Sequence, residues 1–126
     1  MKVAIAILTA LTACTATAGA LEECLARGDQ AAVTRCLLDL EKEAQASLNK
    51  AEGDAGKRAR DIDVATGRSS AAPALAKSMR GFAEYRKTQC DFVRAMYASG
   101  NGAEQAQLGC MVDLMRRRVR ELQLQL

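Results

Sequence analysis

The sequence predicts an all-α fold: a small disulfide-stapled bundle of three main helices with a short N-terminal helical turn. Beyond residue 20 the chain is rich in Ala, Leu, Glu, Lys, Gln and Arg and poor in β-branched residues, which favours helix. Apolar residues recur there at steps of three and four, and no segment alternates as a strand would. The same region holds four of the five cysteines, which is the even set that disulfides require.

The elements follow from the turn residues that separate them. A short helical turn over residues 21–27 ends at Gly28. One long amphipathic helix follows, and Gly53 and Gly56 weaken its middle. Its apolar face is predicted to comprise Val33, Leu37, Leu40, Ala44, Leu48, Ala51, Ala55, Ala59 and Ile62.

The second main helix begins at Ser70, with Pro73 in the first turn, where a missing backbone N–H is tolerated. Its apolar face is predicted to comprise Leu75, Met79, Phe82, Cys90, Val93 and Tyr97. The third main helix begins near Asn101, which is followed three residues later by Glu104, the pattern of a capping box. Its apolar face is predicted to comprise Leu108, Met111, Met115, Val119, Leu122 and Leu126.

Residues 1–20 resemble a secretory signal peptide, which leaves a single domain over residues 21–126. Lys2 precedes an apolar run over residues 3–13 that would extend roughly 17 Å as a helix, too short to span a hydrocarbon core of about 30 Å. The small residues Ala18-Gly19-Ala20 predict cleavage before Leu21 and a periplasmic or secreted protein. The alternative is a lipobox, Leu11-Thr12-Ala13-Cys14, which would leave a lipoprotein anchored to the membrane through Cys14. We favour release, because the segment before Cys14 is short for a lipoprotein signal.

The remaining cysteines predict two disulfides in an oxidising compartment. Cys90 and Cys110 are equidistant from Gly100, and Cys24 and Cys36 are equidistant from Gln30. An antiparallel helix pair brings equidistant residues to the same level, so we expect the pairs Cys24–Cys36 and Cys90–Cys110. A zinc site is the rival interpretation, but the chain has no histidine and no C-x2-C spacing, so we predict no metal and no cofactor.

Composition argues against two classes of function. With 18 basic and 15 acidic residues the chain is nearly neutral, so it lacks the electrostatic footprint of a nucleic-acid-binding protein. The dense run Arg116-Arg117-Arg118-Val119-Arg120 is predicted to be a solvated helix face. An enzyme is not expected, because histidine is absent, the cysteines are expected to be oxidised, and the carboxylates Glu41, Glu43, Asp61 and Asp63 are spaced two apart, on different helix faces.

Several segments together are similar to one known family. They are Cys36, Leu48-Asn49, the segment Phe82-Ala83-Glu84-Tyr85-Arg86-Lys87-Thr88-Gln89-Cys90, the turn Gly100-Asn101-Gly102, and CMVDLMRRRVREL over residues 110–122. The chain resembles the LprI-type lysozyme-inhibitor N-terminal domain, with Arg86, Cys90, Cys110, Arg118, Glu121 and Leu122 at the matching positions. It departs from the family pattern by lacking a Trp near Phe82, by having Lys87 in place of an acid, and by having Ala51 where an aromatic residue is common.

The resemblance implies a small exported helical domain and, for some members, inhibition of lysozyme. The partner would then be a lysozyme or another envelope protein. The alternative is a periplasmic structural or regulatory interaction domain without inhibitory activity. The sequence makes no prediction of oligomeric state.

Two arginines are candidate target-binding residues. Arg68 lies in the polar connection over residues 63–70 and could meet the carboxylates of a lysozyme groove. The uncharged turn over residues 99–102 is the other candidate loop. Arg86 lies beside the apolar face of its helix, and for it the competing prediction is a partly buried ion pair with Glu41, Glu43 or Glu121.

Overall fold

The computed structural model describes residues 19–98 and 100–124, without the side chain of Asn101. Four helices make up this part of the chain: α1 (Ala20–Leu25), α2 (Gln30–Thr66), α3 (Ala71–Met96) and α4 (Asn101–Leu124). No strand occurs in the described ranges, so the predicted all-α bundle is confirmed. Residues 1–18 of the predicted leader, which include the lipobox at Cys14, lie outside the described residues, as do the apolar contact of Leu126 and the capping side chain of Asn101.

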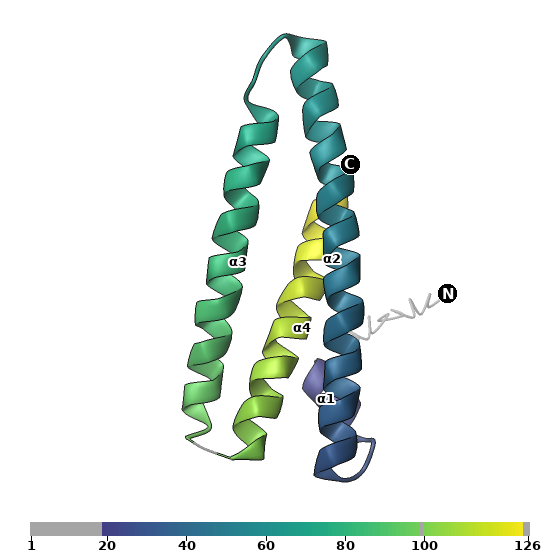
Figure 1. Cartoon of the computed structure of the whole chain (residues 1–126), viewed down its shortest axis with the longest axis vertical. Coiled ribbons are helices and arrows are strands. Elements are labelled where there is room, and N and C mark those ends of the chain that lie inside the picture. The colour runs from purple at the N-terminus through teal and green to yellow at the C-terminus, as the bar shows by residue number, and fades with distance from the viewer. Residues whose placement is uncertain (1–18, 99, 125–126) are drawn as a thin grey trace, which may run out of the picture.

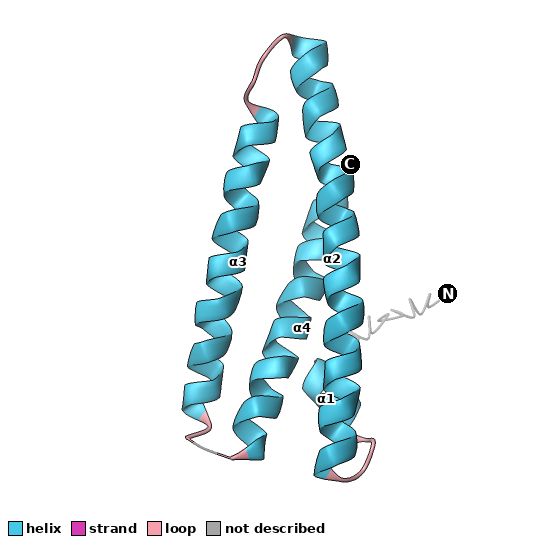
Figure 2. Ribbon diagram, in the orientation of Figure 1, coloured by secondary structure: helices cyan, strands magenta, loops and turns pink. Residues whose placement is uncertain are grey.

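The long helices α2 and α3 form an antiparallel hairpin, and α4 packs back against both (Figures 1 and 2). The short helix α1 lies against α2 and α4, at the end of the bundle far from the α2–α3 connection. Because α4 is shorter than its neighbours, α2 and α3 continue beyond it as a two-helix projection. We call the end of this projection, residues 62–72, the tip.

Local signals set the ends of α2 and the start of α3. The side chain of Asp29 accepts the backbone N–H of Ala32 at 2.8 Å and caps the start of α2. Gly67 ends α2 in the left-handed conformation, with φ of 66°. Pro73 lies in the first turn of α3, as predicted.

The core is built from small and aliphatic side chains where α2 meets α4. Leu37, Val112 and Met115 are its largest fully buried non-cysteine members. Most of the predicted apolar face of α2 is buried, and its alanines allow the helices to approach closely. Ile62 is an exception because it lies in the projecting part of α2, beyond the end of α4. Tyr97 was also predicted to face the core but is about half exposed, because it forms the C-cap of α3.

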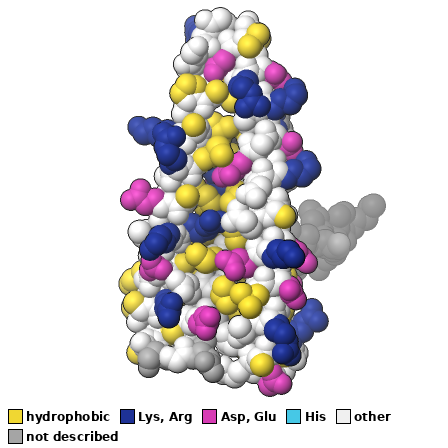
Figure 3. All heavy atoms as spheres, in the orientation of Figure 1, with side chains coloured by type: hydrophobic (Ala, Val, Ile, Leu, Met, Phe, Trp, Pro, Cys, Tyr) yellow, Lys and Arg dark blue, Asp and Glu magenta, His cyan; other side chains and the backbone are white. Residues whose placement is uncertain are grey.

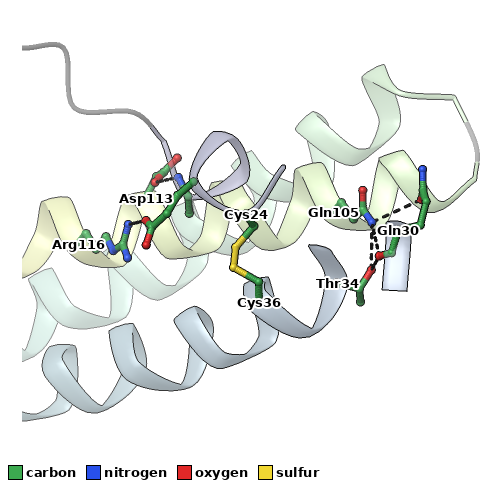
Figure 4. Close-up of a disulfide and its surroundings, with 9 residues drawn as sticks. Cys24, Gln30, Thr34, Cys36, Gln105, Asp113 and Arg116 are labelled. Carbon is green, nitrogen blue, oxygen red and sulfur yellow. Dashed lines mark hydrogen bonds and ion pairs between the residues drawn. A yellow bond between two sulfur atoms is a disulfide. The ribbon is translucent and has the colours of Figure 1, made fainter. Parts of the chain in front are cut away.

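Both predicted disulfides are present. Cys24–Cys36 joins α1 to α2 with a Cα–Cα distance of 5.7 Å (Figure 4). Cys90–Cys110 joins α3 to α4 with a distance of 5.6 Å. Among the described residues of α3, Cys90 alone is fully buried. The covalent link therefore holds a helix that has few other deeply buried contacts.

Replacement by alanine is expected to have opposite effects at Gly53, within α2, and at Gly67, the C-cap of α2. A Cβ at Gly53 would meet no atom within 4 Å, so Gly53→Ala should raise the free energy of unfolding by about 1 kcal/mol. Gly67 has positive φ, so Gly67→Ala should lower the free energy of unfolding by about 1 kcal/mol. Urea denaturation of the two variants measures both changes, and shifts of the same sign would contradict the conformations assigned here.

Candidate functional site

Arg68 lies in the connection between α2 and α3, at the tip. The left-handed Gly67 reverses the chain, and the backbone N–H of Arg68 donates to the carbonyl of Asp63 at 3.1 Å. The Arg68 side chain is exposed, and it makes no ion pair within the described ranges. The fold thus presents an uncompensated cation at the end of a narrow projection.

The carboxylate of Asp63 holds this connection in one conformation. Its Oδ1 accepts the backbone N–H groups of Ser70 and Ala71 at 3.0 and 2.8 Å, and its Oδ2 accepts that of Ala72 at 3.0 Å. These N–H groups belong to the start of α3, where Ser70 itself provides no side-chain cap. A single residue of α2 therefore caps α3 across the connection.

The same contacts lower the pKa of Asp63. The hydrogen bonds from Ala72, Ala71 and Ser70, in that order of importance, favour the ionised carboxylate. With the pKa depressed in the folded chain, the stabilisation is complete above the pKa of the unfolded chain. It is lost as pH falls through the lower pKa of the folded chain. The tip is consequently braced at neutral pH.

Apolar surface accompanies the cation at the tip. Val64 is 84% exposed and Ile62 is 55% exposed on the last turns of α2. A groove of about 340 Å³ begins beside Ile62 and Ala71 and runs down to the end of α4. It is lined by Ala55, Arg58, Ala59, Ile62, Ala71, Ala74, Leu75, Ser78, Arg118 and Leu122. Figure 3 shows hydrophobic side chains gathered along the seam between α3 and the other long helices.

Arg86 lies at the seam between α2 and α3. The prediction that it forms an ion pair with a glutamate was wrong. Its Nη1 donates to Oε1 of Gln45 at 3.1 Å, and its guanidinium carbon lies 5.8 Å from the centroid of the Phe82 ring. Neither Glu41, Glu43 nor Glu121 pairs with it in the described structure, because Gln45 is the α2 side chain that it reaches. Contact of Arg86 with a target stays a prediction, but its half-buried position suits a structural role.

The basic run of α4 was predicted to be a solvated helix face, but only part of it is exposed. Arg116 pairs with Glu23 of α1 at 3.0 Å, whereas Arg117 and Arg120 are exposed. The Arg118 side chain is only 13% exposed; it donates to Ser78 Oγ at 2.7 Å and lies 5.6 Å from the Phe82 ring centroid. The helical spacing could have revealed this, since Arg118 is three residues after buried Met115 and four before buried Leu122.

A second surface was missed by the sequence argument. Tyr85, Phe92 and Met96 are all about half exposed or more, and steps of seven and four place them on one side of α3. We call these three residues the α3 outer stripe. The sequence could have indicated this second apolar face, because separations of seven and four residues fit the helical repeat.

The described residues offer exposed surfaces suited to binding another protein. No group of His, Cys, Asp and Glu among them could hold a metal ion. Within those ranges, no helix combines the length and apolar character needed to cross a membrane. What the geometry presents is a braced cationic tip with adjoining apolar surface, together with the α3 outer stripe.

Comparison with protein families decides the relationship of the chain. A family model described as lysozyme inhibitor LprI matches residues 22–122, which includes every disulfide cysteine and nearly all of the four helices. The chain belongs to the LprI family. Comparison with curated proteins and with solved structures finds no match.

Proposed function

We propose that this LprI-family protein inhibits a lysozyme by protein–protein binding, with the α2–α3 tip entering the substrate groove. A lysozyme groove holds two carboxylates that flank the scissile glycosidic bond. Arg68 is the tip residue that can form charge-assisted hydrogen bonds with such carboxylates. The observation that supports this assignment is the exposed, unpaired position of Arg68 at the end of a two-helix projection.

The local structure favours binding by reducing its entropic cost. Gly67 sets the reversal of the chain, and Asp63 fixes the start of α3 through three hydrogen bonds. A loop already held in its bound conformation loses little freedom on association, which raises affinity. The exposed side chains of Val64 and Ile62 add apolar contact area beside the cation, as is typical of an interface centre with a polar rim.

Reversal of the charge at Arg68 tests the proposal. We expect Arg68→Glu to weaken lysozyme inhibition at least tenfold, about 1.4 kcal/mol, because a carboxylate would then face the carboxylates of the groove. The measurement is the inhibition constant against a panel of lysozymes, with circular dichroism to verify unchanged helicity. Arg35→Glu is the matched control, because Arg35 is an exposed arginine of α2 near the opposite end of the bundle.

The outcomes separate the parts of the proposal. Full inhibition by Arg68→Glu would remove the tip from the mechanism while leaving the activity intact. Equal losses in Arg68→Glu and Arg35→Glu would indicate a general charge effect instead of a specific contact. An inactive wild-type protein would refute lysozyme inhibition itself.

The proposal includes export, which the leader-like residues 1–20 and the disulfides support. Release into the periplasm or medium is favoured, and lipid attachment at Cys14 is the alternative.

An interaction domain without inhibitory activity is the second candidate function, and the α3 outer stripe favours it. Large apolar side chains exposed together on one face are typical of a protein contact surface. The lysozyme assay discriminates between these two functions.

A further inference from the structure

The folded domain begins before Leu21. Gly19 is the N-cap of α1, and its carbonyl accepts the backbone N–H of Glu23 at 3.0 Å. Ala20 is 0% exposed, and its backbone N–H donates to Oδ1 of Asp113 on α4 at 2.9 Å (Figure 4). Gly19 and Ala20 are therefore structural residues of the domain.

Two glycines lie at the close contact between α1 and α4. A Cβ at Gly19 would lie 2.8 Å from Oδ2 of Asp113. Across the contact, a Cβ at Gly109 would lie 3.0 Å from the Cβ of Leu21 and 3.3 Å from its backbone nitrogen. Glycine on each side lets the start of α1 lie directly against α4.

Cleavage before Leu21, which the sequence predicts, would remove this arrangement. It would delete the buried Ala20 side chain and the hydrogen bond to Asp113, and α1 would lose its N-cap. The next small-x-small sequence upstream is Ala16-Thr17-Ala18, which would place the cut just before Gly19.

We propose that the exported precursor is cleaved between Ala18 and Gly19, and that the new α-ammonium of Gly19 pairs with Asp113. This inference rests on the export proposed above. A membrane-bound signal peptidase would add water across the Ala18–Gly19 peptide bond, leaving a carboxylate on Ala18 and an ammonium on Gly19. A Cβ built at Gly19 would lie 2.8 Å from Oδ2 of Asp113, so an ammonium bonded to the same Cα would lie near that oxygen. Oδ2 accepts no hydrogen bond within the described ranges. Cleavage thus places a cation, which the uncleaved peptide lacks, next to the carboxylate of Asp113.

The first test is the N-terminus of the protein recovered from an exporting bacterial host. N-terminal sequencing should give Gly-Ala-Leu-Glu-Glu, and the intact mass should equal that of residues 19–126 with two disulfides. A chain that starts at Leu21 or at an acylated Cys14 would overturn the cleavage proposal while preserving export. An uncleaved chain retained in the cytoplasm would overturn this proposal and the proposed export together.

The second test concerns the pairing. A chain that starts at Leu21 should melt at least about 5 °C below one that starts at Gly19, because it lacks the buried residue and the cap. Asp113→Asn should lower the melting temperature of the Gly19 chain more than that of the same chain with an acetylated N-terminus, because acetylation removes the charge. Asp39→Asn, at an exposed aspartate of α2, is the control. Equal losses from Asp113→Asn with and without acetylation would overturn the ion pair.

Discussion

Reduction of both disulfides is expected to lower the free energy of unfolding by about 6 kcal/mol. The links close segments with sequence separations of 12 and 20, and each contributes about 3 kcal/mol in the chain-entropy model. A domain of this size has a total stability of about 5–15 kcal/mol, so the reduced chain would be marginal. The core offers little compensation, because alanines form much of the buried face of α2.

The stability lost on removal of a disulfide should differ between the parts of the chain. The described part of α3 has Cys90 as its one fully buried residue, so removal of the Cys90–Cys110 link should loosen the whole helix. Removal of the Cys24–Cys36 link should mainly release the short helix α1. Hydrogen exchange of the Cys90→Ser/Cys110→Ser and Cys24→Ser/Cys36→Ser double variants would measure this difference.

Thermal unfolding with and without reductant, with free thiols counted, measures the total effect. Proteolysis followed by mass mapping establishes the pairs. An unchanged melting temperature in the fully reduced protein would contradict the expected dependence on the disulfides. A link from Cys24 or Cys36 to Cys90 or Cys110 would contradict the antiparallel arrangement of the helices.

The disulfide pairs were predictable because they depend on local geometry. A turn centred near Gly100 brings Cys90 and Cys110 to the same level, whatever the remaining helices do. Periodicity likewise identified the buried face of α2. It could not show where a neighbouring helix stops, so Ile62 was predicted to be buried although α4 ends before reaching it.

The position of Arg68 was also predictable, because glycine and serine mark the connection between the two longest helices. The hydrogen bonds by which Asp63 holds this connection in place were not predictable. Asp63 lies on α2 and caps α3 seven to nine residues later, a contact that depends on the path of the connection. The partner of Arg86 was missed for a similar reason: several side chains of α2 were within conceivable reach, and their relative heights follow from the packing of two helices.

Replacement of Arg118 is expected to have the second large effect on the free energy of unfolding. Arg118→Ala should lower the free energy of unfolding by about 2 kcal/mol, because it removes a charge-assisted hydrogen bond to Ser78 and the packing of a long stem. Arg86→Ala should cost less, about 1 kcal/mol, because its hydrogen bond to Gln45, at 3.1 Å, is longer than the 2.7 Å bond from Arg118 to Ser78. Urea denaturation of both variants measures the difference.

Arg118→Met separates the two contributions of that side chain. The stem of methionine restores most of the packing against Phe82, and it also removes the Nε–H group that is buried without a hydrogen-bond partner among the described residues. We therefore expect Arg118→Met to recover at least half of the stability lost in Arg118→Ala. Lysozyme inhibition per folded molecule should be unchanged in both variants, because the proposed contact is at Arg68. Loss of inhibition with unchanged stability would instead assign Arg118 to the target interface and extend that interface down the groove from the tip.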